Sequence, residues 1–195
     1  FSFGGCYIYG TGFTFDDQDA GASPVAEMHR IIEEHPESSA LVSPYIGGEE
    51  FLRDPRQMHR RYVINFGEMT ESEARQYPGL FAVVEAKVQP ERQRLSDTTD
   101  SIRRKKFWWL WSRQTPSLDD AIEGKARKLM HPFTSGNVAF GFVPHDTIVA
   151  GPHIVFAFDR HDAFAVLQAQ AHECWVRFLS SSMKDDLRYA PTDCF

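Results

Sequence analysis

A basic segment followed by tryptophans carries the strongest chemical signal in this sequence. Residues 103–106 read Arg-Arg-Lys-Lys, and residues 107–111 read Phe-Trp-Trp-Leu-Trp. Lysine and arginine neutralise phosphates and release counterions from nucleic acid, which gives affinity independent of base sequence. Trp108 and Trp109 either stack on bases or brace the segment against a core. The composition alone also fits a solvated charged turn beside a hydrophobic anchor.

Charge is distributed unevenly along the chain. The 195 residues carry a net charge of −6, which by itself counts against nucleic-acid binding, because DNA-binding domains usually have a basic surface. Residues 103–128, however, are rich in lysine and arginine and contain only Asp119, Asp120 and Glu123 as acids. We therefore predict that phosphates are bound by Arg103, Arg104, Lys105, Lys106, Lys125, Arg127 and Lys128.

Sequence patterns for catalysis or metal binding are missing. The histidines form neither an HExxH motif nor a paired Cys/His spacing, and no GxSxG elbow occurs. Gly10-Thr11-Gly12 is too short for a dinucleotide fingerprint, and no S-adenosylmethionine motif is visible. We expect no catalytic residue, no metal site and no cofactor in this chain. Cys6, Cys174 and Cys194 fit reduced cytoplasmic thiols.

The first half of the chain mixes short strands and helices. Residues 1–15 predict two short strands, and Ser23-Pro24 begins a helix. Residues 61–66 predict a central strand, and a second helix follows Pro78. The charged residues 91–106 form either a solvated helix or a mobile arm. A subdivision of the domain would fall there.

The second half predicts an antiparallel sheet and a long helix. Residues 127–158 are typical of a β-meander with turns at 144–146 and 151–152. Asp159 is expected to cap a long amphipathic helix with an apolar face of Phe164, Leu167, Ala171, Cys174, Trp175 and Phe178. The predicted fold is α+β: an antiparallel sheet packed with several helices, ending in this C-terminal helix, in a single domain over residues 1–195.

Four ordered segments resemble the target recognition domain of MmeI-like (type IIL) restriction-modification N6-adenine DNA methyltransferases. They are residues 12–16, residues 44–50 with 61–66, residues 77–92 with 108–109, and residues 155–195. The last of these segments includes the final stretch of the chain, which runs from Ser180-Ser181-Ser182 to Cys194-Phe195. Together the segments cover nearly the whole chain.

The resemblance implies a module that binds double-stranded DNA and contains no catalytic residue. A methyltransferase domain of the same, longer parent chain would receive the target adenine and use S-adenosylmethionine. The parent would act in restriction-modification or phage defence in the cytoplasm of a bacterium or archaeon, with or without a fused endonuclease. Since the chain begins with Phe1 rather than Met, we interpret it as a fragment excised from that parent.

The resemblance also indicates where bases would be read, namely residues 131–137 and the turn at 151–153. Asn137 suits a bidentate contact with adenine, and Ser135 and His153 suit a guanine edge. Relatives commonly carry basic residues around 131–136, where this chain has His, Pro, Thr, Ser and Gly. Such a difference is expected if the loop sets specificity. As turn formers, the same three residues would only shape the backbone.

Two other classes of function compete with DNA recognition. A protein-interaction module would dock a partner of a defence complex through a patch formed by Trp108, Trp109 and Trp111. Its binding would depend far less on salt than binding to DNA does. An independent small enzyme is disfavoured by the missing motifs. No apolar run approaches the ~18 residues of a membrane span, so we expect no membrane partner.

Overall fold

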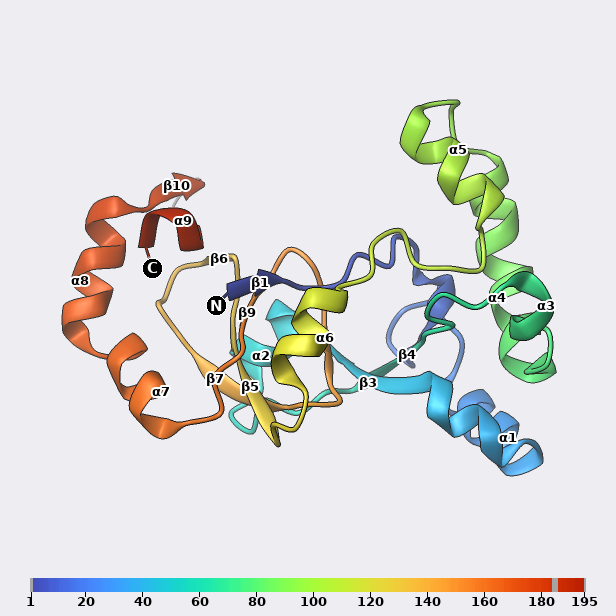
Figure 1. Cartoon of the computed structure of the whole chain (residues 1–195), viewed down its shortest axis with the longest axis horizontal. Coiled ribbons are helices and arrows are strands. Elements are labelled where there is room, and N and C mark those ends of the chain that lie inside the picture. The colour runs from blue at the N-terminus through green and yellow to red at the C-terminus, as the bar shows by residue number, and fades with distance from the viewer. Residues whose placement is uncertain (1, 184–185, 195) are drawn as a thin grey trace. The chain divides into compact units, whose positions relative to one another are not determined.

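The computed structural model describes residues 2–183 and 186–194, and its helices and antiparallel sheets confirm the α+β class (Figure 1). The chain divides into two compact units. Unit 1 comprises Phe1–Cys6, Ile46–His59 and Thr115–Phe195, and unit 2 comprises Tyr7–Tyr45 and Arg60–Gln114. The chain therefore passes from one unit to the other after residues 6, 45, 59 and 114.

Unit 1 is built on a four-stranded sheet with the order β1-β9-β5-β7. Its strands are β1 (Ser2–Gly4), β9 (Ile154–Phe156), β5 (Arg127–His131) and β7 (Gly141–Pro144), all paired antiparallel. β5 takes a central position and pairs with both β7 and β9. Residues 128–131 of β5 are all buried, as expected for a strand covered on both faces. The short strand β8 (Ile148–Val149) lies outside this sheet.

Alternating side chains divide the core of unit 1 between the two faces of the sheet. Leu129 and Phe156 belong to one cluster, which the C-terminal segment completes with Leu167, Val176 and Tyr189. The other cluster contains Met130, Val155 and Val143 with residues of α2 (Gly48–Arg53) and α6 (Pro116–Ile122). This division follows from the period of two in a β-strand.

The C-terminal helical segment differs from the expected single helix. It consists of α7 (His161–Leu167) and α8 (Gln170–Leu179), and Arg160 rather than Asp159 is the N-cap of α7. The interruption falls at Ala169, whose backbone is extended with φ of −68° and ψ of 146°. The side chain of Gln168, the residue before it, bonds another segment. Its Oε1 accepts a hydrogen bond from the Phe140 amide at 2.9 Å, and its Nε2 donates to the Val138 carbonyl at 3.0 Å.

The interruption also changes which side chains of this segment are buried. Leu167 and Val176 are buried, whereas Trp175 is exposed and Phe178 is 83% exposed. The chain then forms a sheet of β10 (Ser181–Met183), β11 (Asp186–Arg188) and β6 (Thr134–Ser135), and ends with the short helix α9 (Pro191–Cys194).

Unit 2 combines a small antiparallel sheet with four helices. β4 (Arg61–Ile64) pairs with β2 (Thr14–Phe15) on one side and β3 (Val42–Ile46) on the other, which confirms it as a central strand. The helices are α1 (Val25–Glu34), α3 (Glu71–Ala74), α4 (Pro78–Gln93) and α5 (Thr99–Lys106). Short 3-10 turns occupy Thr11–Phe13 and Pro36–Leu41.

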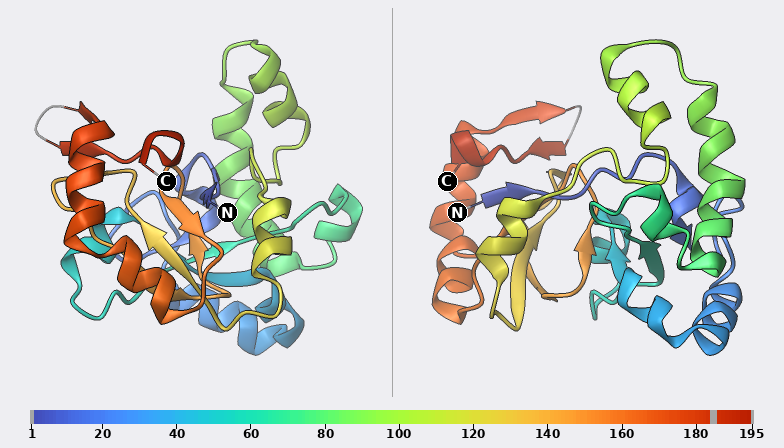
Figure 2. Two further views of the ribbon diagram at one scale, coloured as in Figure 1. Left: turned by 60° about the vertical axis from the view of Figure 1, so that its left-hand side comes forward. Right: turned by 45° about the vertical axis from the view of Figure 1, so that its right-hand side comes forward.

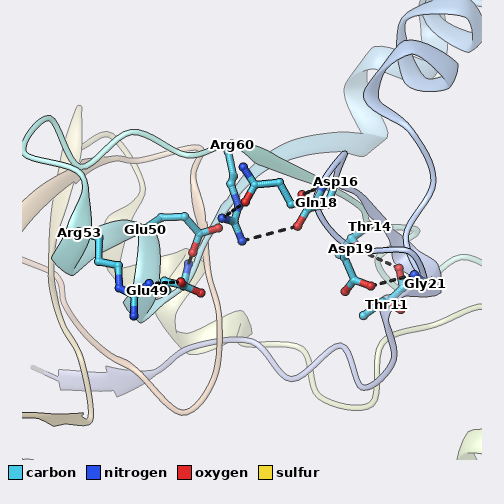
Figure 3. A network of polar contacts seen from close by, with 11 residues as sticks. Thr11, Thr14, Asp16, Gln18, Asp19, Gly21, Glu49, Glu50, Arg53 and Arg60 are labelled. Carbon is cyan, nitrogen blue, oxygen red and sulfur yellow. Dashed lines mark hydrogen bonds and ion pairs between the residues drawn. The ribbon is translucent and has the colours of Figure 1, made fainter.

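Local hydrogen bonds fix the ends of these elements. Thr70 and Glu73 form a capping box at the start of α3, and Thr98 caps α5 through the Ser101 amide. In the loop after β2, the guanidinium of Arg60 reaches Gln18 and lies 3.9 Å from the buried carboxylate of Asp16 (Figure 3). The charged residues 91–106 thus include an ordered helix, α5, which packs beside α4 (Figure 2).

Candidate nucleic-acid interface

The four predicted phosphate ligands of residues 103–106 occupy the last turn of α5. They differ in exposure and in whether an acidic side chain pairs with them. Arg103 and Lys106 are exposed. Arg104 forms an i,i+4 ion pair with Asp100, and Lys105 pairs with Asp97 at 2.5 Å. Exposed pairs of this kind stabilise a fold by at most about 1 kcal/mol, so a phosphate can compete with them. Arg103 and Lys106 are the cations most accessible to a ligand in this segment.

The tryptophans that follow α5 are anchors in the core of unit 2. Trp108, Trp109 and Trp111 are 5%, 7% and 4% exposed. The indole N–H of Trp109 donates to the Met69 carbonyl at 2.9 Å, and that of Trp111 donates to the Ile64 carbonyl at 2.8 Å. Of the two roles predicted for Trp108 and Trp109, stacking on bases or bracing the segment against a core, their burial supports bracing. Their burial leaves no exposed patch for the proposed partner docking.

The remaining predicted phosphate ligands lie in unit 1, and two of them serve the fold. Lys128 is 2% exposed, and its ammonium donates to the His145 carbonyl at 2.8 Å. Burial lowers the pKa of Lys128 to about 8. Arg127 donates through Nε to the Asp159 carbonyl at 2.9 Å and lies 3.8 Å above the Phe142 ring. Lys125 is partly exposed, and of the three side chains it is the one most available to a ligand.

The predicted reading loop forms a tight turn after β6. Ser135 is buried, and its hydroxyl donates to the Asn137 carbonyl at 2.7 Å while accepting from the Asn137 amide at 3.1 Å. Ser135 thus shapes the turn. Asn137 is exposed, and both of these hydrogen bonds involve its backbone rather than its side-chain amide. Of the two residues, only Asn137 presents a side chain that a base edge can reach.

His153 connects two loops of unit 1. Its Nε2 accepts a hydrogen bond from the Gly48 amide at 2.8 Å, and its Nδ1 accepts one from the Phe133 amide at 3.4 Å. The turn before it contains a cis peptide bond between Gly151 and Pro152. A side chain added at Gly48 would meet the imidazole at 2.8 Å, which shows how closely the two loops approach. The His153 ring is therefore already engaged in positioning the backbone.

His131 precedes the reading loop and lies in an aromatic cluster. The residue is 2% exposed, and its ring packs in tilted contacts against Phe140 and Tyr189, with centroid distances of 4.6 and 4.5 Å. Burial lowers the pKa of His131 to about 4. His172 approaches the same cluster and shares a hydrogen bond of 3.2 Å with the Tyr189 hydroxyl. The cluster fixes the start of the loop on which Asn137 lies.

Sequence reasoning overlooked one arginine that organises unit 2. Arg92 is 3% exposed, and its guanidinium donates to the carbonyl oxygens of Leu110, Ile8 and Phe107 at 2.6, 3.1 and 3.3 Å. Burial, with a smaller contribution from the positive charge of Arg104, lowers its pKa to about 10. Its position gave a signal, because Arg92 continues the i,i+4 series of the buried residues Val84 and Val88.

Arg92 also lines a cavity of about 800 Å³ within unit 2. The polar lining residues include Arg103, Arg104 and Arg113, and the aromatic ones include Tyr7, Tyr9, Phe107 and Trp111. Among the residues that the structure describes, no three His, Cys, Asp or Glu side chains come together as metal ligands. Nor does that part of the chain contain a helix long and apolar enough to cross a membrane.

The fold is α+β, with a cationic helix in one unit and a polar turn in the other. The family model described as "MmeI, target recognition domain" matches residues 17–195. The chain therefore belongs to the family of MmeI target recognition domains, and such a domain recognises a DNA sequence within a restriction-modification enzyme.

Among solved structures, the chain is similar to the type IIL restriction-modification enzyme MmeI in complex with DNA. The TM-score is 0.74 and the sequence identity is 20%, and the match covers 99% of this chain and 24% of that chain. At this identity the likeness shows a shared fold, and this chain spans about a quarter of the other's length. No curated protein matches the sequence.

Proposed function

We propose that this chain selects a short sequence in double-stranded DNA and positions its target adenine for a methyltransferase domain of the same parent protein. The family match over residues 17–195 is the observation that carries the proposal. The catalytic domain would use S-adenosylmethionine, and the parent would act in restriction-modification or phage defence in the cytoplasm. Extrusion of the adenine costs a few kcal/mol of unstacking, which contacts from a recognition module help to offset.

The geometry suits a division of labour between the two units. In unit 2, Arg103 and Lys106 would bind phosphates, with Arg104 and Lys105 available by exchange of their acidic partners. In unit 1, Lys125 would add a phosphate contact, and Asn137 would read a base edge. We omit Lys128 from the proposed interface because its ammonium is buried and bonded to a carbonyl.

Replacing Arg103 and Lys106 together with alanine should weaken binding to all duplexes by about tenfold. Each lost phosphate contact also lowers the slope of log affinity against log salt by about 0.9, so the slope should fall by about 2. Fluorescence anisotropy over a salt series measures both quantities. The matched control is a double alanine variant of Arg30 and Arg53, whose side chains are exposed and ion-paired. Equal slopes in the two variants would remove α5 from the interface.

Replacing Asn137 with alanine should change sequence preference more than overall affinity. A bidentate amide contact discriminates between bases by about 1–3 kcal/mol, so preference at one position should relax about tenfold. Competition with a set of duplexes differing at single positions measures this effect. Gln76→Ala, which removes an exposed amide side chain in unit 2, provides the control. A uniform loss across all duplexes would identify Asn137 as a turn former only.

A map of modified bases tests the role in methylation. In cells that express the full-length parent, N6-methyladenine should be confined to one short motif. The Asn137→Ala parent should methylate a relaxed set of motifs. If the parent has an intact methyltransferase domain and genomic DNA gains no methylation, the proposed positioning of adenine is wrong.

A further inference from the structure

The lining of the cavity in unit 2 contains more cationic than acidic side chains. Four arginines line it, Arg92, Arg103, Arg104 and Arg113, whereas the acidic lining residues are Glu68 and Asp100. Asp100 is already paired with Arg104. An excess of positive charge thus surrounds a hollow in a chain whose net charge is −6. Guanidinium groups favour the planar, bidentate recognition of phosphate and carboxylate.

Several donors at this cavity have no partner within the described residues. They are the Nε atoms of the buried Arg92 and of Arg104, together with the hydroxyl of Ser112. Leaving a buried donor unsatisfied costs about 1–3 kcal/mol, and more for a charged group. These three atoms are themselves inaccessible to solvent, so the cations of the lining that a ligand can reach directly are the exposed Arg103 and Arg113.

Aromatic side chains occupy the same cavity. Tyr7 and Tyr9 are stacked, with ring centroids 5.7 Å apart and planes inclined by 23°. The guanidinium of Arg104 lies 4.9 Å from the centre of the Tyr9 ring. A base that stacks on an aromatic side chain gains about 1–3 kcal/mol whatever its identity. The lining therefore combines a surface for a base with donors for a phosphate.

The backbone at Tyr9 is strained in a way that keeps this ring exposed. Tyr9 has φ of 48°, and Gly10, which follows, has φ of 101°. A non-glycine residue with positive φ costs of order 1–3 kcal/mol and persists only where the surroundings impose it. Here the ring is half exposed rather than buried. Tyr9 thus combines an unfavourable backbone conformation with an aromatic side chain that is accessible to a ligand.

Hydrogen bonds within the chain connect the other lining segments. The Gln114 side chain donates to the Gly67 carbonyl at 3.1 Å and to Asn65 Oδ1 at 3.2 Å, and the Gly67 amide donates to the same Oδ1 at 2.9 Å. The Arg113 amide donates to the Tyr7 carbonyl at 3.3 Å. These bonds hold the ends of the lining segments in place without a ligand.

We propose that this cavity binds a nucleotide, with its phosphate held by the arginines and its base stacked on the tyrosines. The phosphate belongs either to a strand of bound DNA or to a free nucleotide. The first source rests on the proposed function, and the second does not depend on it. A volume of about 800 Å³ falls in the range of small-molecule sites.

The test is a calorimetric titration of the full 195-residue chain with 2′-deoxyadenosine 5′-monophosphate. Saturable binding is expected, and deoxyadenosine without phosphate should bind at least tenfold more weakly. Tyr9→Ala and Arg113→Met should each weaken nucleotide binding about tenfold. Both side chains are substantially exposed, so folding should survive, and circular dichroism verifies it. Arg94→Met, an exposed residue outside the lining, serves as the matched control.

Competition then identifies the source of the nucleotide. Displacement of a fluorescent duplex by the monophosphate, at the concentration that saturates the cavity, assigns the site to a DNA strand. Saturable binding without displacement assigns it to a free nucleotide. A folded chain that does not bind the monophosphate saturably, or that binds deoxyadenosine equally well, overturns the inference. Sequence preference among duplexes is measured separately, so failure of the cavity and failure of DNA recognition remain distinguishable.

Discussion

Replacing Arg92 with methionine should lower the free energy of unfolding of unit 2 by about 3 kcal/mol or more. The guanidinium bonds the carbonyl oxygens of Ile8, Phe107 and Leu110, so one side chain joins the start of the unit to the segment after α5. Methionine keeps much of the apolar volume but leaves three carbonyls without their donor. Hydrogen bonds to a charged group contribute about 1.5–3 kcal/mol each, although such losses are not additive.

Urea denaturation followed by tryptophan fluorescence measures this loss, since Trp108, Trp109 and Trp111 all lie in unit 2. With a pKa of about 10, Arg92 remains charged at neutral pH, so the comparison at pH 7 reports the charged side chain. Arg94→Met is the matched control, because Arg94 is exposed and its replacement should change stability by less than about 0.5 kcal/mol. Equal effects of the two variants would show that water or other groups satisfy the three carbonyls.

Elements with a local cause were predictable from the sequence. The capping box at Thr70 and Glu73 fixes the start of α3, and Pro78 begins α4 where its missing amide costs nothing. β9 was predictable because a continuous apolar run, here Ile-Val-Phe, is typical of a buried strand. These features need only neighbouring residues, so tertiary structure did not override them.

The division into two interleaved units had no local signal. Unit 1 takes residues from three separate stretches, of which Ile46–His59 lies between two stretches of unit 2. Such an arrangement depends on contacts between residues distant in sequence. The predicted boundary near 91–106 reflected composition alone, and this stretch lies within unit 2. A single functional domain over residues 1–195 stays a prediction.

Burial separated the alternatives that residue type had left open. A tryptophan after a basic run suits stacking and bracing equally, and only the indole contacts with the carbonyls of Met69 and Ile64 show bracing. Lys128 looked like its neighbour Lys125 in sequence, but its place in the central strand β5 buries its ammonium. The single apolar stripe predicted to end at Phe178 was wrong, because the backbone is extended at Ala169, next to the Gln168 side chain that bonds another segment.

Lowering the pH from 7 to 4 should destabilise unit 1 by about 3 kcal/mol through His131 alone. The folded-state pKa of about 4 lies below the ordinary value of 6.5, because the ring is buried among Phe140 and Tyr189. Between these values the unfolded chain binds more protons than the folded chain, so stability rises with pH and is lost as pH falls from 6.5 toward 4. One pKa unit corresponds to about 1.4 kcal/mol, which gives the stated size.

The variant His131→Phe isolates this contribution, since phenylalanine keeps an aromatic ring in the cluster and cannot be protonated. Urea unfolding of unit 1 at pH 7 and pH 4 should show a loss about 3 kcal/mol smaller in the variant than in the parent sequence, with amide hydrogen exchange of the β5 residues as the probe. His29→Phe is the control, because His29 is exposed on α1 and should leave the pH dependence unchanged. His172, whose pKa burial also lowers, remains in both proteins and cancels in the comparison. If His131→Phe retains the full loss at pH 4, protonation of other groups causes it, and the turn that carries Asn137 is not held by a neutral histidine.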